Sequence, residues 1–277
     1  MKEIDVNSIS TKELYKYLTS SITPRPIALV SSIDKDGNSN LSPFSFFNLF
    51  SIKPPILIFS PLNRVRDNTK KDTLNNISQV KECVIALVNK NIAQQVSLAS
   101  TSYSPEEDEF EKAGFNKVKA KCIHPYLVKE SPVNFECKVN SIVELGNEGG
   151  SGNLVICEVL KIHINNNVLD DQGNIDPLKL DIISRLGSNW YGKTNQSSLY
   201  EITRPISRIG IGIDNLPEDI LTSNILSGSD LAILASIEAI PNKKNNNTTP
   251  LKREEKHILA KKLLKEGKID EAWKILI

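Results

Sequence analysis

The chain has 277 residues, 39% of them hydrophobic and 24% charged, a composition that excludes an intrinsically disordered protein. Thirty-four Lys and Arg against 33 Asp and Glu leave a net charge of +1, which argues against a nucleic-acid-binding protein. The N-terminus lacks the apolar core of a signal peptide, and no stretch approaches the roughly 18 apolar residues of a membrane span. We therefore expect a cytoplasmic protein that binds neither nucleic acid nor membranes.

Short apolar runs bounded by turn residues predict a mainly β-structure up to about residue 164. The expected strands cover residues 27–33, 56–60, 83–88, 133–143 and 153–164. The turn at 34–38 predicts a hairpin after the first strand. The glycine-rich segment 146–152 is either a hairpin loop or a phosphate-binding loop, and the hairpin is favoured because no helix follows it. Hairpins without βαβ alternation indicate an antiparallel barrel.

Two helices are expected among these strands. One spans residues 73–81, with Asp72 as its N-cap. The other runs from Ser104, which is placed to form a capping box with Glu107, to Gly114. A short helical pattern also precedes the first strand.

The C-terminal part has a different character. Two short helices are expected in 217–240, and a polar, proline-bounded stretch follows. The last segment reads as a helical hairpin broken at Gly267, which must bury its apolar face on the barrel or on a partner. The expected parts are a barrel domain over 1–210, a helical extension packed on the barrel over 211–240, a linker over 241–250 and a helical tail over 251–277.

The sequence does not support a metal site or a catalytic nucleophile. At least three of the four cysteines lie in apolar, strand-like runs and are expected to be reduced core residues. The three histidines are far apart, and none belongs to a zinc-binding motif. Residues 187–194 match the P-loop pattern G-x-x-x-x-G-K-T, but Trp190 and Tyr191 occupy the loop and no helix is expected after it. We therefore reject a nucleoside triphosphate site.

Two regions have residues suited to a cofactor. The run Ser45-Phe46-Phe47-Asn48 combines aromatic surface with hydroxyl and amide groups, which suits a planar heteroaromatic ligand; a barrel corner with buried phenylalanines is the alternative. Residues 60–73 bring four cations to the start of a predicted helix, which suits a phosphate; a solvated basic loop is the alternative.

Several segments together resemble one known family, the flavin reductase-like family with an FMN-binding split barrel. They are PRPIALVSSIDKDGNSNLSPFSFFN, SPLNRVRDNTKKDTLNNI, EFEKAGF, ESPVNFECKV, GNLVICEVLKIHI and RLGSNWYGKT up to Arg204-Pro205. The resemblance covers about residues 20 to 210 and implies a six-stranded Greek-key split β-barrel with peripheral helices. It also implies a homodimer with FMN near the dimer interface. Residues 211–240 are similar to an extension in some members, whereas the tail lies outside the family pattern.

The resemblance implies a set of cofactor-binding residues. Those along the isoalloxazine and ribityl chain would be Ser31, Ser32, Ser45, Phe46, Phe47 and Asn48. Those around the phosphate would be Ser60, Arg64, Lys71, Asp72 and Thr73, with Lys71 and Thr73 in direct contact. Arg25 and Arg185 are candidates for cations at a second site.

The implied function is an FMN-dependent oxidoreductase, with FAD as the alternative flavin. NADH or NADPH would deliver hydride to the flavin, and the electrons would pass to free flavin, a metal chelate, oxygen or a partner protein. No catalytic side chain is expected, because the cofactor carries the chemistry. Two other functions stay open: an FMN-carrying electron-transfer protein without NAD(P)H turnover, and an interaction module that kept the barrel but lost the flavin.

Overall fold

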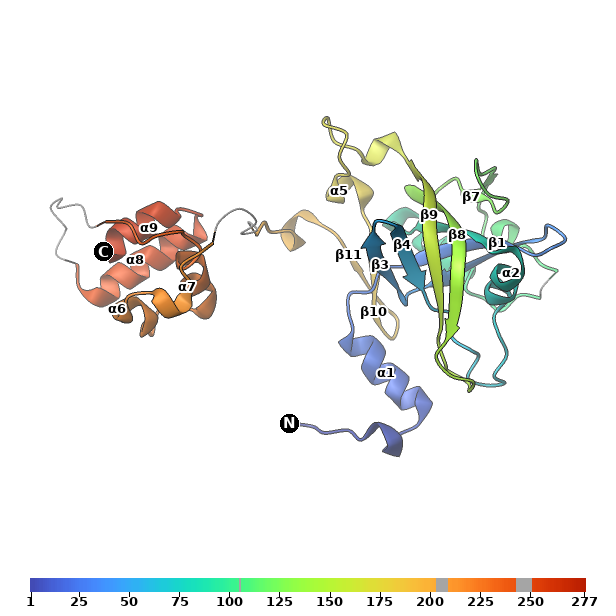
Figure 1. Cartoon of the computed structure of the whole chain (residues 1–277), viewed down its shortest axis with the longest axis horizontal. Helices are drawn as coiled ribbons and strands as arrows, with labels where there is room; N and C mark the ends of the chain where they lie inside the picture. The colour runs from blue at the N-terminus through green and yellow to red at the C-terminus, as the bar shows by residue number, and fades with distance from the viewer. Residues whose placement is uncertain (105, 203–208, 243–250) are drawn as a thin grey trace. The chain divides into compact units, whose positions relative to one another are not determined.

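The structure is a computed structural model that describes residues 1–104, 106–202, 209–242 and 251–277. These residues form two compact units, Met1–Leu199 and Tyr200–Ile277 (Figure 1). The Arg204-Pro205 pair, which is part of the family resemblance, lies outside the described residues. Nearly all of the predicted linker over 241–250 also lies outside them.

An antiparallel sheet of seven strands forms the body of the first unit (Figure 1). The strands are β1 (Ala28–Ile33), β2 (Ser39–Phe44), β3 (Phe47–Ile52), β4 (Pro55–Phe59), β5 (Glu82–Leu87), β8 (Val133–Glu144) and β9 (Asn153–Ile164). Their spatial order is β2-β1-β5-β8-β9-β4-β3. The two edge strands, β2 and β3, are joined by only Ser45 and Phe46, so the sheet must curl until its edges approach each other. The split-barrel prediction is thereby confirmed, with seven strands in the sheet in place of the expected six, and β3 is the strand of this sheet that the sequence did not predict.

Short helices and two small ladders complete this unit. The helices are α1 (Thr11–Ser21), α2 (Asp72–Val80), α3 (Ala93–Leu98), α4 (Glu109–Lys112) and α5 (Pro177–Leu180), with 3-10 turns at Val6–Ser8, Lys90–Ile92, Asn166–Val168 and Gln196–Ser198. The ladders pair β6 (Lys117–Val118) with β7 (Leu127–Val128), and β10 (Ile183–Gly187) with β11 (Trp190–Lys193).

Two predicted helix starts were wrong. Helix α2 begins at Asp72 itself, so Lys71 takes the N-cap position and Asp72 lies in the first turn. Helix α4 begins at Glu109 and is capped by Asp108, whose side chain accepts the N–H of Phe110. Asp108, which lies closer to the apolar residues of the helix, therefore serves as the N-cap in place of Ser104.

Alternation along β1 divides its side chains between two cores. Ala28 and Val30 of β1 face the barrel interior, where they pack with Phe59 and with Ile77 of α2. Leu29 faces a second core beneath α3 and α4. The predicted reduced cysteines are confirmed as free thiols, and three of them are buried in the barrel interior, namely Cys83, Cys137 and Cys157.

Both glycine-containing segments that matched phosphate-loop patterns form hairpins. Glu144 of β8 pairs with Asn153 of β9, so residues 145–152 are the loop of a long hairpin, as predicted. Gly192 and Lys193 lie within β11, paired with β10, and therefore do not form a loop of converging N–H groups. Both findings agree with the rejection of a nucleoside triphosphate site.

The second unit is helical. It contains a 3-10 turn at Ile213–Asn215 and the helices α6 (Glu218–Leu221), α7 (Gly228–Leu234), α8 (Arg253–Lys265) and α9 (Ile269–Leu276). Its core centres on the fully buried Trp273, whose Nε1 donates to the carbonyl of Leu234 at 3.1 Å. The helices of 211–240 and the hairpin of 251–277 thus share one core, although the sequence assigned them to separate parts. Packing of residues 211–240 on the barrel stays a prediction.

Within the described ranges, no helix has the length and apolar character needed to cross a bilayer. The same residues contain no group of three or more His, Cys, Asp or Glu side chains arranged to hold a metal ion.

Candidate functional site

The N-terminus of α2 gathers the residues that the sequence placed near a phosphate. Lys71 occupies the N-cap position, and its side chain makes no capping hydrogen bond. The backbone N–H groups of Asp72 and Thr73, in the first turn, have no acceptor among the residues that the structure describes. Unpaired N–H groups and the helix dipole both present positive charge at this end, so the start of α2 favours an anion.

Lys71 adds a cation at the same helix end. Its Nζ lies 5.2 Å from the centre of the Phe44 ring and forms no ion pair with any described residue. Burial lowers the pKa of Lys71 from its ordinary value of 10.5, and the nearby Arg64 lowers it further, whereas Asp72 raises it. A bound anion would stabilise this half-buried ammonium group. The donors at α2 therefore fit a phosphate group.

Arg64 is fixed beside the same helix end by its own loop. Its Nη1 donates to the Thr69 hydroxyl at 3.1 Å and to the Lys70 carbonyl at 2.7 Å, and its Nη2 lies 3.5 Å from a carboxylate oxygen of Asp72. Asp72 thus orients Arg64, and as an anion it would repel a phosphate. Lys71, Arg64 and the backbone N–H groups at the start of α2 are therefore the groups that could contact a bound phosphate directly.

A buried polar network fixes α2 against β1 and β2. The Thr73 hydroxyl donates to Oδ1 of Asn40 at 2.6 Å, and Ser32 reaches the same oxygen at 3.4 Å. Asn76 donates to the Ser32 hydroxyl at 3.3 Å, and Asn40 donates to Glu109 at 2.8 Å. Burial raises the pKa of the Glu109 carboxyl. Because the Thr73 hydroxyl proton is used within this network, Thr73 offers a ligand its backbone N–H.

The glycine-rich hairpin loop, residues 145–152, supports the cationic loop, by which we mean residues 60–71 with Arg64 and Lys71. A Cβ atom at Gly149 would lie only 2.9 Å from the carbonyl oxygen of Val65, so this close approach requires glycine. Nearby, Asn153 donates to the side chain of Asn63 at 3.1 Å, and its backbone N–H donates to the Ser60 hydroxyl at 3.1 Å. The Ser60 hydroxyl therefore ties the start of the cationic loop to β9.

Ser31 and Ser32, predicted to line the same ligand, point to opposite faces of β1. Ser32 faces α2 and joins the polar network. Ser31 is the cross-strand neighbour of Leu41 and Val84, and its side chain lies on the other face of β1. There its buried hydroxyl has no partner among the described residues. The structure therefore brings only Ser32 to the start of α2.

The predicted ring-binding run 45–48 follows β2 at the split of the barrel. The ring of Phe46 lies 6.5 Å from that of Tyr15 in α1 and 5.9 Å from the Arg25 guanidinium, measured between centres. Phe47 packs against the barrel interior. Asn48 is exposed, and its side chain accepts the N–H of the next residue at 2.8 Å. These residues form an aromatic corner next to Phe44.

The two arginines predicted for a second site have structural partners. Arg25 is buried and donates to the carbonyls of Thr19 and Ile22, which fixes the end of α1. Arg25 and Arg185 exchange backbone hydrogen bonds of 3.0 and 2.9 Å. The Arg185 guanidinium lies 4.5 Å from the centre of the Tyr191 ring. Both arginines therefore join the β10–β11 hairpin and α1 to the barrel.

A hollow of about 310 Å³ lies beside the polar network. It is lined by Asp34, Lys35, Asp36, Asn38, Ser39, Asn40, Asp72, Asn75, Asn76, Gln79, Ser104, Glu107 and Glu109. Its carboxylates outnumber its single lysine, and neither Arg64 nor Lys71 lines it. We therefore do not expect the phosphate in this hollow.

The curled antiparallel sheet, with its two edges joined by a two-residue link, defines a split-barrel protein. The sequence profile described as "Flavin reductase like domain" matches residues 20–179, and the chain belongs to this family of flavin-related oxidoreductases. A protein of Aquifex aeolicus is 36% identical over 191 residues, which cover 69% of this chain and 95% of that protein.

Two solved structures share the fold. Nitrilotriacetate monooxygenase component B from Bacillus cereus has a TM-score of 0.68 at 29% identity, covering 73% of this chain and 98% of its own. The 2-nitrobenzoate 2-nitroreductase NbaA of Pseudomonas fluorescens has a TM-score of 0.65 at 25% identity, covering 76% of this chain and 100% of its own.

Three residues of the polar network beside α2 were not predicted from the sequence: Asn40, Asn76 and Glu109. Each lies within a segment that carried the family resemblance: Asn40 begins NLSPFSFFN, Asn76 lies in KDTLNNI, and Glu109 begins EFEKAGF. These segments could have pointed to the three residues. Only the fold shows that their side chains lie in one hydrogen-bond network.

Proposed function

We propose that this chain binds FMN at the start of α2 and acts as an NAD(P)H-dependent oxidoreductase. The observation that carries the proposal is the half-buried Lys71, which lacks an anionic partner among the described residues and lies next to Arg64 at an open helix N-terminus. A single phosphate matches this donor set, which favours FMN over FAD.

The flavin ring is assigned to the aromatic corner. Phe44 lies beneath Lys71, and Phe46 and Phe47 follow at the split between the edge strands. Apolar and aromatic surface would cover the ring, while the backbone of the corner offers hydrogen bonds to its edges. When bound, the flavin supplies hydride acceptance from NAD(P)H and electron delivery to free flavin, a metal chelate, oxygen or a partner protein. The side chains of the protein would hold the flavin in position.

The alternative is an electron carrier with bound FMN and no NAD(P)H turnover. The two functions differ in one measurement, the anaerobic addition of NADH or NADPH to the FMN-loaded protein. Loss of the flavin absorbance within seconds to minutes supports the oxidoreductase. A spectrum that persists with both nucleotides, but is lost on chemical reduction, supports the carrier.

We also propose a homodimer, located in the cytoplasm as expected from the sequence. The edge strand β3 exposes Leu49, Phe50 and Ile52 by 53%, 64% and 75%. Adjacent apolar side chains on an edge strand are typical of a surface covered by a partner. A second copy of this chain is the partner that the family resemblance implies, with the flavin near the interface.

A further inference from the structure

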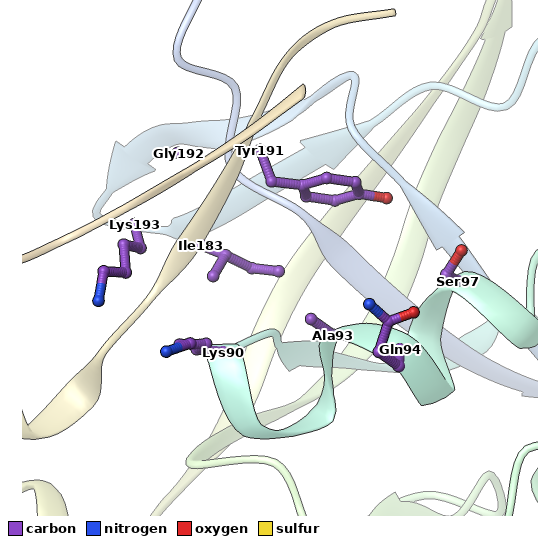
Figure 2. A pocket seen from close by; sticks show the side chains of 8 residues that line it. All are labelled: Lys90, Ala93, Gln94, Ser97, Ile183, Tyr191, Gly192 and Lys193. Carbon is purple, nitrogen blue, oxygen red and sulfur yellow. The ribbon is translucent and has the colours of Figure 1, made fainter. Parts of the chain in front are cut away.

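A second pocket, separate from the proposed flavin site, lies between α3 and the β10–β11 hairpin (Figure 2). Its volume is about 270 Å³. It is lined by Lys90, Ala93, Gln94, Ser97, Ile183, Tyr191, Gly192 and Lys193. None of these residues belongs to the phosphate site at α2.

Backbone hydrogen bonds determine the shape of the pocket. The N–H of Ile183 donates to the carbonyl of Val88 at 3.1 Å, and the N–H of Lys90 donates to the carbonyl of Asp181 at 3.1 Å. Ile183 pairs with Lys193 across the hairpin. These links attach the hairpin to the segment that follows β5, so both lysines lie at the same end of the pocket (Figure 2).

The Tyr191 ring lies along one wall, opposite Ala93 and Gln94, with its hydroxyl toward Ser97 (Figure 2). Arg185 is the cross-strand partner of Tyr191, and its guanidinium lies 4.5 Å from the ring centre without lining the pocket. This contact holds the ring in place. Ile183 supplies buried apolar surface between the ring and the lysines.

The end formed by Lys90 and Lys193 is electropositive. No carboxylate lines the pocket, and neither lysine forms an ion pair within the described ranges. The pocket therefore has an aromatic wall, an apolar floor and an end with two cations that an anion would neutralise.

We propose that this pocket binds a planar aromatic or heteroaromatic molecule that carries a carboxylate or a phosphate. The ring would lie against Tyr191 above Ile183, and its anionic group would reach Lys90 and Lys193. The pocket is small for a ligand site, since such sites have volumes of roughly 300 to 1,000 Å³, and this limits the ligand to about one or two rings. The proposal does not depend on flavin binding.

Calorimetry with the full-length protein tests it, with benzoate and nicotinamide mononucleotide as probes. Benzamide, which lacks the charge, and cyclohexanecarboxylate, which lacks the planar ring, serve as controls. We expect benzoate, nicotinamide mononucleotide or both to bind at least about fivefold more tightly than either control, and more weakly at high salt. The tighter of the two probes identifies a carboxylate or a phosphate as the anionic group. Equal binding of the probes and the controls, or no binding by either probe, overturns the proposal.

Variants locate the binding. Replacing both lysines (Lys90→Gln with Lys193→Gln), or Tyr191→Leu alone, should weaken the tighter probe at least about fivefold. Tyr191→Phe keeps the ring and should bind like the parent, as should the exposed control Lys35→Gln. Circular dichroism verifies that each variant is folded. If the folded double lysine variant and Tyr191→Leu both bind the probe like the parent, the probe binds elsewhere and the proposal is wrong.

Discussion

The hydroxyl of Thr73 donates a 2.6 Å hydrogen bond to the side chain of Asn40, and both residues are buried. This bond joins the first turn of α2 to β2, and Glu109 completes the connection by accepting from Asn40 at 2.8 Å. The position of the proposed phosphate site therefore depends on a contact between segments far apart in the sequence.

Thr73→Val tests this connection, because valine keeps the shape of threonine and removes the donor. Oδ1 of Asn40 would then retain only the 3.4 Å contact with Ser32. We expect a loss of about 1–3 kcal/mol in the free energy of unfolding, measured by urea denaturation followed by circular dichroism. Asn75→Ala, at an exposed position of the same helix, should change it by less than about 0.5 kcal/mol. An equal effect of the two substitutions would contradict the role of the network.

Lys71→Ala should weaken FMN binding about tenfold to a hundredfold, because a charge-assisted contact to the phosphate is lost. Riboflavin, which has no phosphate, should bind the variant and the parent alike. Lys35→Ala, at an exposed lysine in the first hairpin, is the matched control for a change in charge. Titration of flavin fluorescence measures all of these affinities. Parallel losses for FMN and riboflavin would place Lys71 against the ring instead of the phosphate.

The helical unit should lose stability as the pH falls below about 6.5. Burial lowers the pKa of His257 from its ordinary value of 6.5, so below this pH the unfolded chain binds more protons than the folded one. Stability that is present above pH 6.5 is therefore lost as the pH falls through the folded-state pKa. His257→Asn, which retains a polar group for the Ser223 hydroxyl 2.8 Å from the imidazole, should show a smaller acid effect.

Tryptophan fluorescence isolates this effect. Trp273 is fully buried in the helical unit, whereas Trp190 is 74% exposed in the barrel unit. In a Trp190→Phe background, urea unfolding at pH 7.5 and 5.5, about one unit on either side of the ordinary histidine pKa, reports on the helical unit alone. If the His257→Asn variant and the protein that retains His257 show the same pH dependence, another group is responsible.

Phe50→Lys combined with Ile52→Lys should dissociate the proposed homodimer, because burying two charges in an apolar interface is unfavourable. Light scattering should give about twice the chain mass of 30.8 kDa for the parent and the single-chain mass for the variant. Val6→Lys, at another exposed apolar residue, should leave the dimer intact. A dimer that persists in the double variant would exclude β3 from the interface.

Local patterns predicted much of the fold. The apolar run at 27–33 became β1, and the break at Gly267 separates α8 from α9. Strand β3 escaped prediction because the adjacent apolar residues Leu49 and Phe50 break the alternation that is typical of a strand with one buried face. Pairing with β4 defines this strand.

The charged residues of the candidate site could be predicted from the sequence, but the contacts that hold them in place could not. Lys71 and Arg64 were identified because cations precede a helical pattern. Alternation places Ser31 and Ser32 on opposite faces of a strand, but only the packing of α2 reveals which face belongs to the site. Glu109 contacts Asn40 from 69 residues away, a separation that no local pattern bridges.

The most direct test of the proposed flavin site is the visible absorption spectrum of the purified protein after addition of FMN and desalting. We predict a retained flavin spectrum at about one FMN per chain, and a much smaller retained fraction in Lys71→Ala. A folded, colourless parent protein after desalting would contradict the proposed flavin site and would favour a barrel that serves as an interaction module.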